Sequence, residues 1–312
     1  MATKDGVLYV FGNKGMALFD VSNPGTQSLV KIGVTINGKL EYKVNTGAIG
    51  DSSGAAAVVN KDFMYVAGGK GFLVFKVQDA KNPEKVGDVI NTSALSESGG
   101  AAMALKGDRL YLAGGHGLRV MDISTPEVPK LVGGAIDTGA INHSTDVALA
   151  LCENALYVAG GKGLVVYNIG NKDQPEKIGD RIDTGAIYDQ GGASIQIVGK
   201  TMYVAGGKGL ATFDISDPTK PNRVSIDTKT GLVSGNGGTS MLVVDKTLYV
   251  AGGKGLGVYN MAEGTLAKKA KVDTGVISGD GNVRLKLIGD TIFVCAGKGL
   301  ATFHQKTLVS GP

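Results

Sequence analysis

The residues best placed to do chemistry lie in seven glycine-rich phrases, each with one basic side chain. Backbone N–H groups of neighbouring glycines, with a lysine beside them, are able to cradle a phosphate. A nucleotide-binding loop also needs the pattern G-x-x-x-x-G-K-[ST], followed by a helix. The sequence does not contain this pattern, and no helix is predicted after the glycine phrases. We therefore interpret each phrase as a hairpin turn whose glycines adopt positive φ. The basic residues are Lys14, Lys70, His116, Lys162, Lys208, Lys254 and Lys298.

Side chains suited to catalysis are few. The three histidines, His116, His143 and His304, have no Cys, His or carboxylate partner at metal-ligand spacing. Asp146 follows His143 closely, but closeness in sequence does not establish the geometry of a catalytic triad. We predict no catalytic residue, no metal site and no cofactor. An enzyme that uses His143 or Asp146 is the alternative.

The glycine phrases recur at nearly constant intervals of 56, 46, 46, 46, 46 and 44 residues. Repeats of this length stack against one another and share a core, so we predict a single domain over residues 1–312. We call the phrases marker turns, because each one counts a repeat. They lie at residues 12–15, 68–71, 114–117, 160–163, 206–209, 252–255 and 296–299.

One repeat, at residues 191–228, contains four apolar or alternating runs separated by Gly, Lys, Asp and Pro. Four antiparallel strands in about 46 residues are typical of a propeller blade. Seven marker turns therefore predict an all-β fold, a seven-bladed β-propeller, with a solenoid as the alternative. The four predicted strands cover residues 192–198, 201–206, 210–216 and 222–228.

Three segments share the pattern of a strand that runs into Asp-[Ile/Val]-Ser-x-Pro, namely FDVSNPG (19–25), MDISTPEVPKLV (121–132) and FDISDPTKPNRV (213–224). With them, the chain resembles the LVIVD repeat family. The resemblance implies a β-propeller, commonly of secreted or surface proteins, and supplies no catalytic motif. Asn168, Asn260 and His304 replace the aspartate in other repeats.

Both ends of the repeat array depart from the pattern. Small-residue runs predict a first, inner strand for six repeats, but residues 1–3 are too few to supply one for the first blade. A strand from another chain is one way to complete it. The first blade also has extra residues that predict an outer hairpin with its turn at Asn37-Gly38. We expect the tail, with Leu308 and Val309, to pair with the last blade.

In a propeller, the marker turns lie on the same side as the loops that lead into the next blade. We therefore expect a basic ring of the seven marker residues, facing repeated Asp-Thr or Asn-Thr loops. Ligand pockets between blades are one interpretation, and simple lysine–aspartate pairing is the other. The acidic members are Asp137, Asp183, Asp227 and Asp273. Gln196, Arg284 and Lys286 are predicted to face the central channel.

Charge, cysteine content and the lack of long apolar stretches limit the kinds of partner and location that we expect. The formal net charge is only +4, with basic residues spread over all repeats, so we expect no nucleic-acid partner. Cys152 and Cys295 are expected to be small core thiols, with a disulfide between them as the alternative. The sequence shows no signal peptide and no apolar stretch of about 18 residues, so we expect no membrane insertion.

These observations predict a non-enzymatic recognition or structural protein, located outside the cell, at a cell surface or in a virion. A protein partner or self-assembly into a larger particle is the expected interaction. One alternative is a multivalent lectin-like protein that binds glycans through several equal sites. The other is a propeller enzyme with a site on the side of the marker turns.

Overall fold

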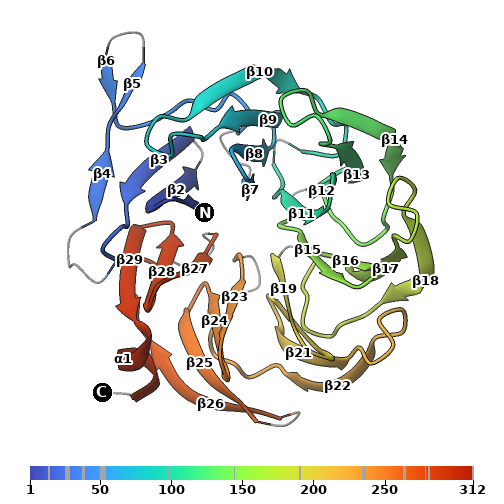
Figure 1. Cartoon of the computed structure of the whole chain (residues 1–312). Helices are drawn as coiled ribbons and strands as arrows, with labels where there is room; N and C mark the ends of the chain where they lie inside the picture. The colour runs from blue at the N-terminus through green and yellow to red at the C-terminus, as the bar shows by residue number, and fades with distance from the viewer. Residues whose placement is uncertain are drawn as a thin grey trace. The chain divides into compact units, whose positions relative to one another are not determined.

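The chain folds into seven consecutive antiparallel sheets, which confirms the predicted seven-bladed β-propeller (Figure 1). Two compact units divide it: unit 1 comprises Met1–Asp146 with Asn171–Gln174, and unit 2 comprises Val147–Gly170 with Pro175–Pro312. The computed structural model describes residues 1–12, 15–24, 29–36, 39–49, 54–96, 98–143, 145–189, 191–233, 237–262, 265–277, 279 and 282–310.

Unit 1 contains blades 1 to 3 and a separate two-stranded hairpin. Within each blade the strands pair in chain order, from the inner first strand to the outer fourth strand. Blade 1 has β1 Ala2–Lys4, β2 Val7–Gly12, β3 Gly15–Asp20 and β4 Val30–Ile32, and the hairpin has β5 Val34–Ile36 and β6 Lys39–Glu41. Blade 2 has β7 Ala56–Asn60, β8 Phe63–Gly68, β9 Gly71–Lys76 and β10 Glu84–Ile90, and blade 3 has β11 Ala102–Lys106, β12 Arg109–Gly114, β13 Gly117–Asp122 and β14 Lys130–Ile136.

Unit 2 contains blades 4 to 7 and a short terminal helix. Blade 4 has β15 Ala148–Cys152, β16 Ala155–Gly160, β17 Gly163–Asn168 and β18 Glu176–Ile182. Blade 5 has β19 Ala193–Val198, β20 Thr201–Gly206, β21 Gly209–Asp214 and β22 Asn222–Asp227, within two residues of the predicted strands. Blade 6 has β23 Ser240–Val244, β24 Thr247–Gly252, β25 Gly255–Ala262 and β26 Thr265–Val272, and blade 7 has β27 Arg284–Ile288, β28 Thr291–Ala296 and β29 Gly299–His304, followed by α1 Gln305–Ser310.

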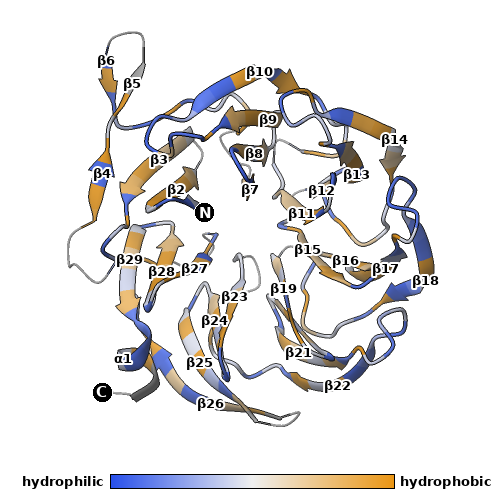
Figure 2. Cartoon of the chain, in the orientation of Figure 1, coloured by the Kyte–Doolittle hydropathy of each residue, from blue (hydrophilic) through white to orange (hydrophobic). Residues whose placement is uncertain are grey.

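Hydrophobic residues concentrate in the middle strands of each blade (Figure 2). All six residues of β16 are buried, and five of the six in β17 are. The outer strand β18 is mostly exposed, and its half-buried Ile178 and Ile182 are the residues that pack on the core. This pattern is what a blade sandwiched between two others requires, because its central strands meet protein on both faces.

Neighbouring inner strands in unit 2 are joined by polar side chains. The Ser194 hydroxyl accepts a hydrogen bond from the Met241 N–H at 3.1 Å, and the Gln196 side chain donates to the Met241 carbonyl at 3.2 Å. One blade further on, the Ser240 hydroxyl accepts from the Leu285 N–H at 3.0 Å. Hydrogen bonds therefore link β19 to β23 and β23 to β27.

Tyrosines on the second strands of three blades bind to the following blade. The Tyr9 hydroxyl donates to the Ala80 carbonyl at 2.7 Å, and the Tyr157 hydroxyl donates to the Pro218 carbonyl at 2.7 Å. Tyr111 makes the equivalent bond to the Lys172 carbonyl at 3.1 Å. The buried Tyr65 hydroxyl has no such acceptor among the described residues.

The first blade obtains its inner strand from its own N-terminal residues, so the predicted missing strand is wrong. Ala2, Thr3 and Lys4 pair with Tyr9, Leu8 and Val7, and this short β1 completes the four-stranded sheet. Three residues suffice because Ala2 is small and buried against the blade. A strand from another chain is therefore not needed here.

The extra hairpin of the first blade is confirmed, and β5 pairs with β6 in a sheet of its own. Its predicted turn, Asn37-Gly38, lies outside the described residues. The tail does not pair as a strand, which corrects that prediction, since residues 305–310 form α1. Leu308 is buried in the apolar cluster of blades 6 and 7, so a helix that places this single side chain satisfies the contact.

Replacement of Tyr157 by Phe should lower the free energy of unfolding by about 1 kcal/mol, because the Pro218 carbonyl loses its donor. Tyr65→Phe is the matched control, since it removes a buried hydroxyl that has no partner among the described residues. Its effect should be neutral or stabilising. Urea unfolding of the two variants measures the contrast, and equal losses would show that the hydroxyl bond does not stabilise the blades.

Burial also raises the pKa of Tyr65 and of Tyr111 to about 12. An unfolded tyrosine loses its proton near pH 10, so the folded state holds protons that the unfolded chain releases. Stability should be complete below about pH 10 and fall as pH rises towards about 12. Urea midpoints measured across this range should decrease, and a constant midpoint would contradict the burial of these hydroxyls.

Candidate functional site

The marker turns are two-residue hairpin turns, as interpreted from the sequence. In blade 4, Gly160 pairs with Gly163 on either side of the turn. Gly163 has φ of 137°, and a Cβ placed there would meet the Ile182 carbonyl oxygen at 2.6 Å. Both the backbone angle and the close approach of the outer strand therefore require glycine.

The backbone N–H of the marker residue is already used within the fold. In blade 5, the Lys208 N–H donates to the Ala186 carbonyl at 2.9 Å. This carbonyl belongs to the loop that enters the blade from its predecessor. The same bond joins Lys70 to Ala48 and His116 to Ala94 in unit 1, and Lys254 to Leu232 and Lys298 to Val276 in unit 2.

The predicted acidic site residues shape these entering loops. The Asp183 carboxylate accepts the Gly185 N–H at 2.9 Å, and the buried Thr184 hydroxyl accepts the N–H groups of Ala186 and Ile187, both at 3.2 Å. Each aspartate thus closes an Asx turn. Asp137, Asp227 and Asp273 do the same with Gly139, Lys229 and Gly275, and so do Asn45 with Gly47 and Asn91 with Ser93.

The marker lysines present their side chains to solvent. Lys70, Lys162, Lys208, Lys254 and Lys298 are exposed, and within the described ranges none of them forms an ion pair with an aspartate or glutamate. The lysine–aspartate pairing considered from the sequence is therefore not found there. Lys14 lies outside the described residues.

One marker lysine has an aromatic neighbour. The Lys208 ammonium lies 5.7 Å from the centre of the Tyr188 ring, within the range of a cation–π contact. Tyr188 is 37% exposed, so the pair is open to solvent. This contact between residues 20 positions apart was not foreseen from the sequence.

In unit 1 the marker residue of blade 3, His116, also has an aromatic neighbour. The rings of His116 and His143, both exposed, lie edge to face with their centres 4.7 Å apart. His143 is therefore placed against a marker turn. The Asp146 side chain packs where a Cβ on Gly100 would meet its oxygen at 2.1 Å. The sequence contains one sign that this turn differs from the others, because His116 is the one histidine among the marker residues.

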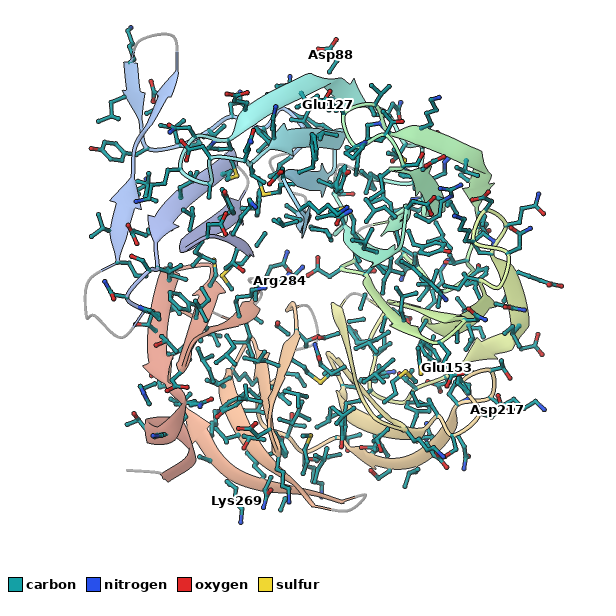
Figure 3. The ribbon with its side chains drawn as sticks, in the orientation of Figure 1. Asp88, Glu127, Glu153, Asp217, Lys269 and Arg284 are labelled. Atoms are coloured by element: carbon teal, nitrogen blue, oxygen red, sulfur yellow. The ribbon has the colours of Figure 1, made fainter. Side chains whose placement is uncertain are left out.

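The residues predicted to face a channel lie on separate strands. Gln196 is on β19 and bonds to β23, whereas Arg284 and Lys286 are on β27, with β23 between the two strands. Arg284 points inward from the first strand of its blade, and its guanidinium donates to the Val283 carbonyl at 2.9 Å (Figure 3). The structure does not bring the three side chains together as one site.

An ion network around the buried Arg109 was missed by sequence reasoning. Arg109, 8% exposed, forms ion pairs with Asp108, Asp122 and Asp173, and Lys172 binds Asp108 at 2.6 Å. The Lys172 ammonium lowers the pKa of Asp108. This network links blade 3 to residues 171–174 of the same unit, and residue spacing alone gives no sign of it.

Other chemistry-bearing groups are scattered. Cys152 and Cys295 are both free thiols, and burial raises the pKa of each. Among the residues described, no three His, Cys, Asp or Glu side chains are grouped as metal ligands. No described helix is long and apolar enough to cross a bilayer.

Comparison with known families agrees with the repeat. The LVIVD repeat family matches residues 99–137, which cover blade 3, and residues 191–228, which cover blade 5. Two segments of the chain therefore match the LVIVD repeat. In both matched segments, the Asx turns and the marker turn described above fall within or beside the matched strands. No curated protein has a sequence that matches the chain.

Solved structures that are similar to the whole chain confirm the fold. A Desulfotomaculum acetoxidans protein of unknown function aligns over 98% of this chain and 93% of its own, with 14% identity and a TM-score of 0.69. A Bacteroides uniformis protein described as a candidate 6-phosphogluconolactonase aligns over 97% and 96%, with 14% identity and a TM-score of 0.69. The extracellular domain of a candidate two-component system from B. thetaiotaomicron aligns over 97% of this chain and 37% of its own, with 17% identity and a TM-score of 0.62.

The role of the aspartates can be tested with a substitution that two blades already contain. Asp183→Asn should leave stability unchanged, because Asn45 and Asn91 close the same turn elsewhere. Asp183→Ala should lower the free energy of unfolding by about 1 kcal/mol, since the Gly185 N–H loses its acceptor. Thermal and urea unfolding of the two variants measure the difference. An Asn variant as unstable as the Ala variant would show that the charge itself matters.

Proposed function

We propose that the protein is a non-enzymatic recognition protein that binds an acidic surface of a protein partner through its marker turns. The observation that carries the proposal is the set of exposed marker lysines without a paired carboxylate among the described residues. A cation that is held at a rigid turn and not neutralised by its own protein favours an anionic partner.

The backbone of each turn supports this role. The marker N–H is fixed to the entering loop, so the lysine begins from a defined position even though its side chain is free. Four marker turns lie in unit 2, at the same end of consecutive blades. Three of them, at Lys208, Lys254 and Lys298, have this bond. Several weak, equal contacts add up to avidity when the partner presents a repeated or extended acidic surface.

The sequence alone allows the aspartates to be parts of ligand pockets or partners of the lysines. In this proposal they shape the loops instead. One carboxylate oxygen of Asp183, Asp227 and Asp273 accepts a backbone hydrogen bond within its loop. The aspartates therefore shape the loop beside each lysine and need not touch the ligand. Tyr188 adds an exposed aromatic surface next to Lys208.

We assign the protein to a cell surface, a virion or another extracellular assembly. The resemblance to LVIVD repeats supports this location, and one structurally similar protein is described as an extracellular domain. The contribution of each partner contact would fall as salt concentration rises, because exposed charges are screened within about 8 Å at physiological ionic strength.

The double variant Lys162→Ala/Lys208→Ala should weaken binding to acidic peptides on an array by about tenfold, since each exposed charge contact contributes about 0.7 kcal/mol. The control is Lys200→Ala/Lys246→Ala, which removes the same charge from turns at the opposite end of the blades. The control should bind like the unmodified protein. Equal binding by both double variants would refute the proposal, and a signal confined to a glycan array would favour a lectin.

A further inference from the structure

The last blade is incomplete at its outer edge. Blade 7 has the strand order β27-β28-β29, whereas each of the other six blades has a fourth strand outside its third. The residues after β29 form α1, which contacts β26 as well as β29. Within the residues that the structure describes, no strand pairs with the outer side of β29.

The exposure of one side chain in each blade can be compared with and without a fourth strand. The residue two places after the marker residue pairs with the outer segment of its own blade in blades 1 to 6, and is at most 2% exposed. Leu300 occupies the same position in blade 7, has no outer partner among the described residues and is only half-buried. The six pairs are Met16 with Val44, Phe72 with Ile90, Leu118 with Ile136, Leu164 with Ile182, Leu210 with Asp227 and Leu256 with Val272.

The register of β29 shows which backbone groups point outward. Gly299 pairs with Ala296 across the marker turn, and a two-residue hairpin is closed by a hydrogen-bonded pair. The Gln305 N–H, six residues on, donates to the Asp290 carbonyl at 2.9 Å, in keeping with that alternation. The N–H and C=O groups of Leu300, Thr302 and His304 therefore point away from β28.

This edge also lacks the features by which proteins protect exposed strands. Native edge strands usually carry lysines, prolines or bulges that discourage pairing. The outer strand β26 carries three lysines, and β18 has four charged residues and a register shift against β17. The sequence of β29, GLATFH, has no lysine, no proline and no carboxylate.

We propose that the outer edge of β29 binds an extended segment of a partner protein as a fourth, antiparallel strand. Blades 2 to 4 define the chemistry of this segment, because the fourth strand of each places two branched aliphatic residues, four positions apart, opposite the third strand. In blade 4, Ile182 and Ile178 lie opposite Leu164 and Val166, whose counterparts in blade 7 are Leu300 and Thr302. The partner segment therefore carries two branched aliphatic residues four positions apart, with polar residues between them. This inference goes beyond the proposed function, since it involves a strand edge and not the marker lysines.

The probe is a labelled peptide that copies residues 175–183, the fourth strand of blade 4. The control peptide has the same sequence with methylated amide nitrogens at the two isoleucines, which removes the ladder donors and keeps the side chains. Fluorescence anisotropy with the full chain should show binding of the first peptide and at least about tenfold weaker binding of the second.

The chain offers a matched pair of variants, because β21 in blade 5 and β29 share the sequence GLATF. Thr302→Pro removes an outward N–H that has no partner among the described residues, so it should leave the unfolding temperature nearly unchanged while abolishing peptide binding. Thr212→Pro removes the equivalent N–H where β22 pairs with it, and should lower the unfolding temperature clearly.

Peptide binding that Thr302→Pro abolishes supports the proposal. Absence of binding by the unmodified protein at about 1 mM peptide, or equal binding by the Thr302→Pro variant, overturns it. Self-association that Thr302→Pro removes would assign the edge to a second copy of the chain and also overturn it. If that variant does not fold, hydrogen exchange of the Leu300 and Thr302 amides decides. Fast exchange that the peptide slows supports the site, and protection without peptide refutes it.

Discussion

Within the described residues, five of the seven blades of this protein share one backbone hydrogen bond between the marker turn and the loop that enters the blade. The bond from the Lys208 N–H to the Ala186 carbonyl recurs at four other marker residues, in both units. It fixes the incoming chain against the hairpin of the blade it is about to form. The Asx turn at Asp183 and the buried Thr184 hydroxyl hold that carbonyl in place, so three of the most repeated residues in the sequence serve a single contact.

The opposite end of the blade is held by a different bond. Tyr9, Tyr111 and Tyr157 donate to carbonyls in the turn between the third and fourth strands of the following blade. A buried hydroxyl that leaves water must find an acceptor, so these tyrosines set the distance between neighbouring blades. With the marker turn at one end and the tyrosine at the other, adjacent blades are joined at both ends of their sheets. The regular repeat is thus explained by architecture before any ligand is considered.

The sequence was sufficient for features that repeat and insufficient for those that occur once. Strand positions in blade 5 were predicted within two residues, because turn residues and apolar runs recur in every unit. β1 was missed because three residues are too short for a periodic signal, yet Ala2 pairs with Tyr9 in full register. The helix α1 was missed because a single buried contact, that of Leu308, decides its position. The His116–His143 contact and the Arg109 network join distant loops, which no local spacing reveals.

The two proposed binding surfaces, the marker lysines and the β29 edge, show the same contrast between repeated and unique features. The marker lysines form a repeated surface because the same turn recurs in each blade. The turn needs glycine on both sides, and the residue between the glycines is exposed. The β29 edge follows from a place where repetition stops. Five of the six residues of β21 are buried in blade 5, whereas the nearly identical β29 is half-buried or exposed along its whole length in blade 7. The outer neighbour is one difference between the two strands, because β22 pairs with β21 and no described strand pairs with the outer side of β29. The greater exposure of Leu300 therefore accompanies the loss of its outer partner, in a strand whose first five residues are unchanged.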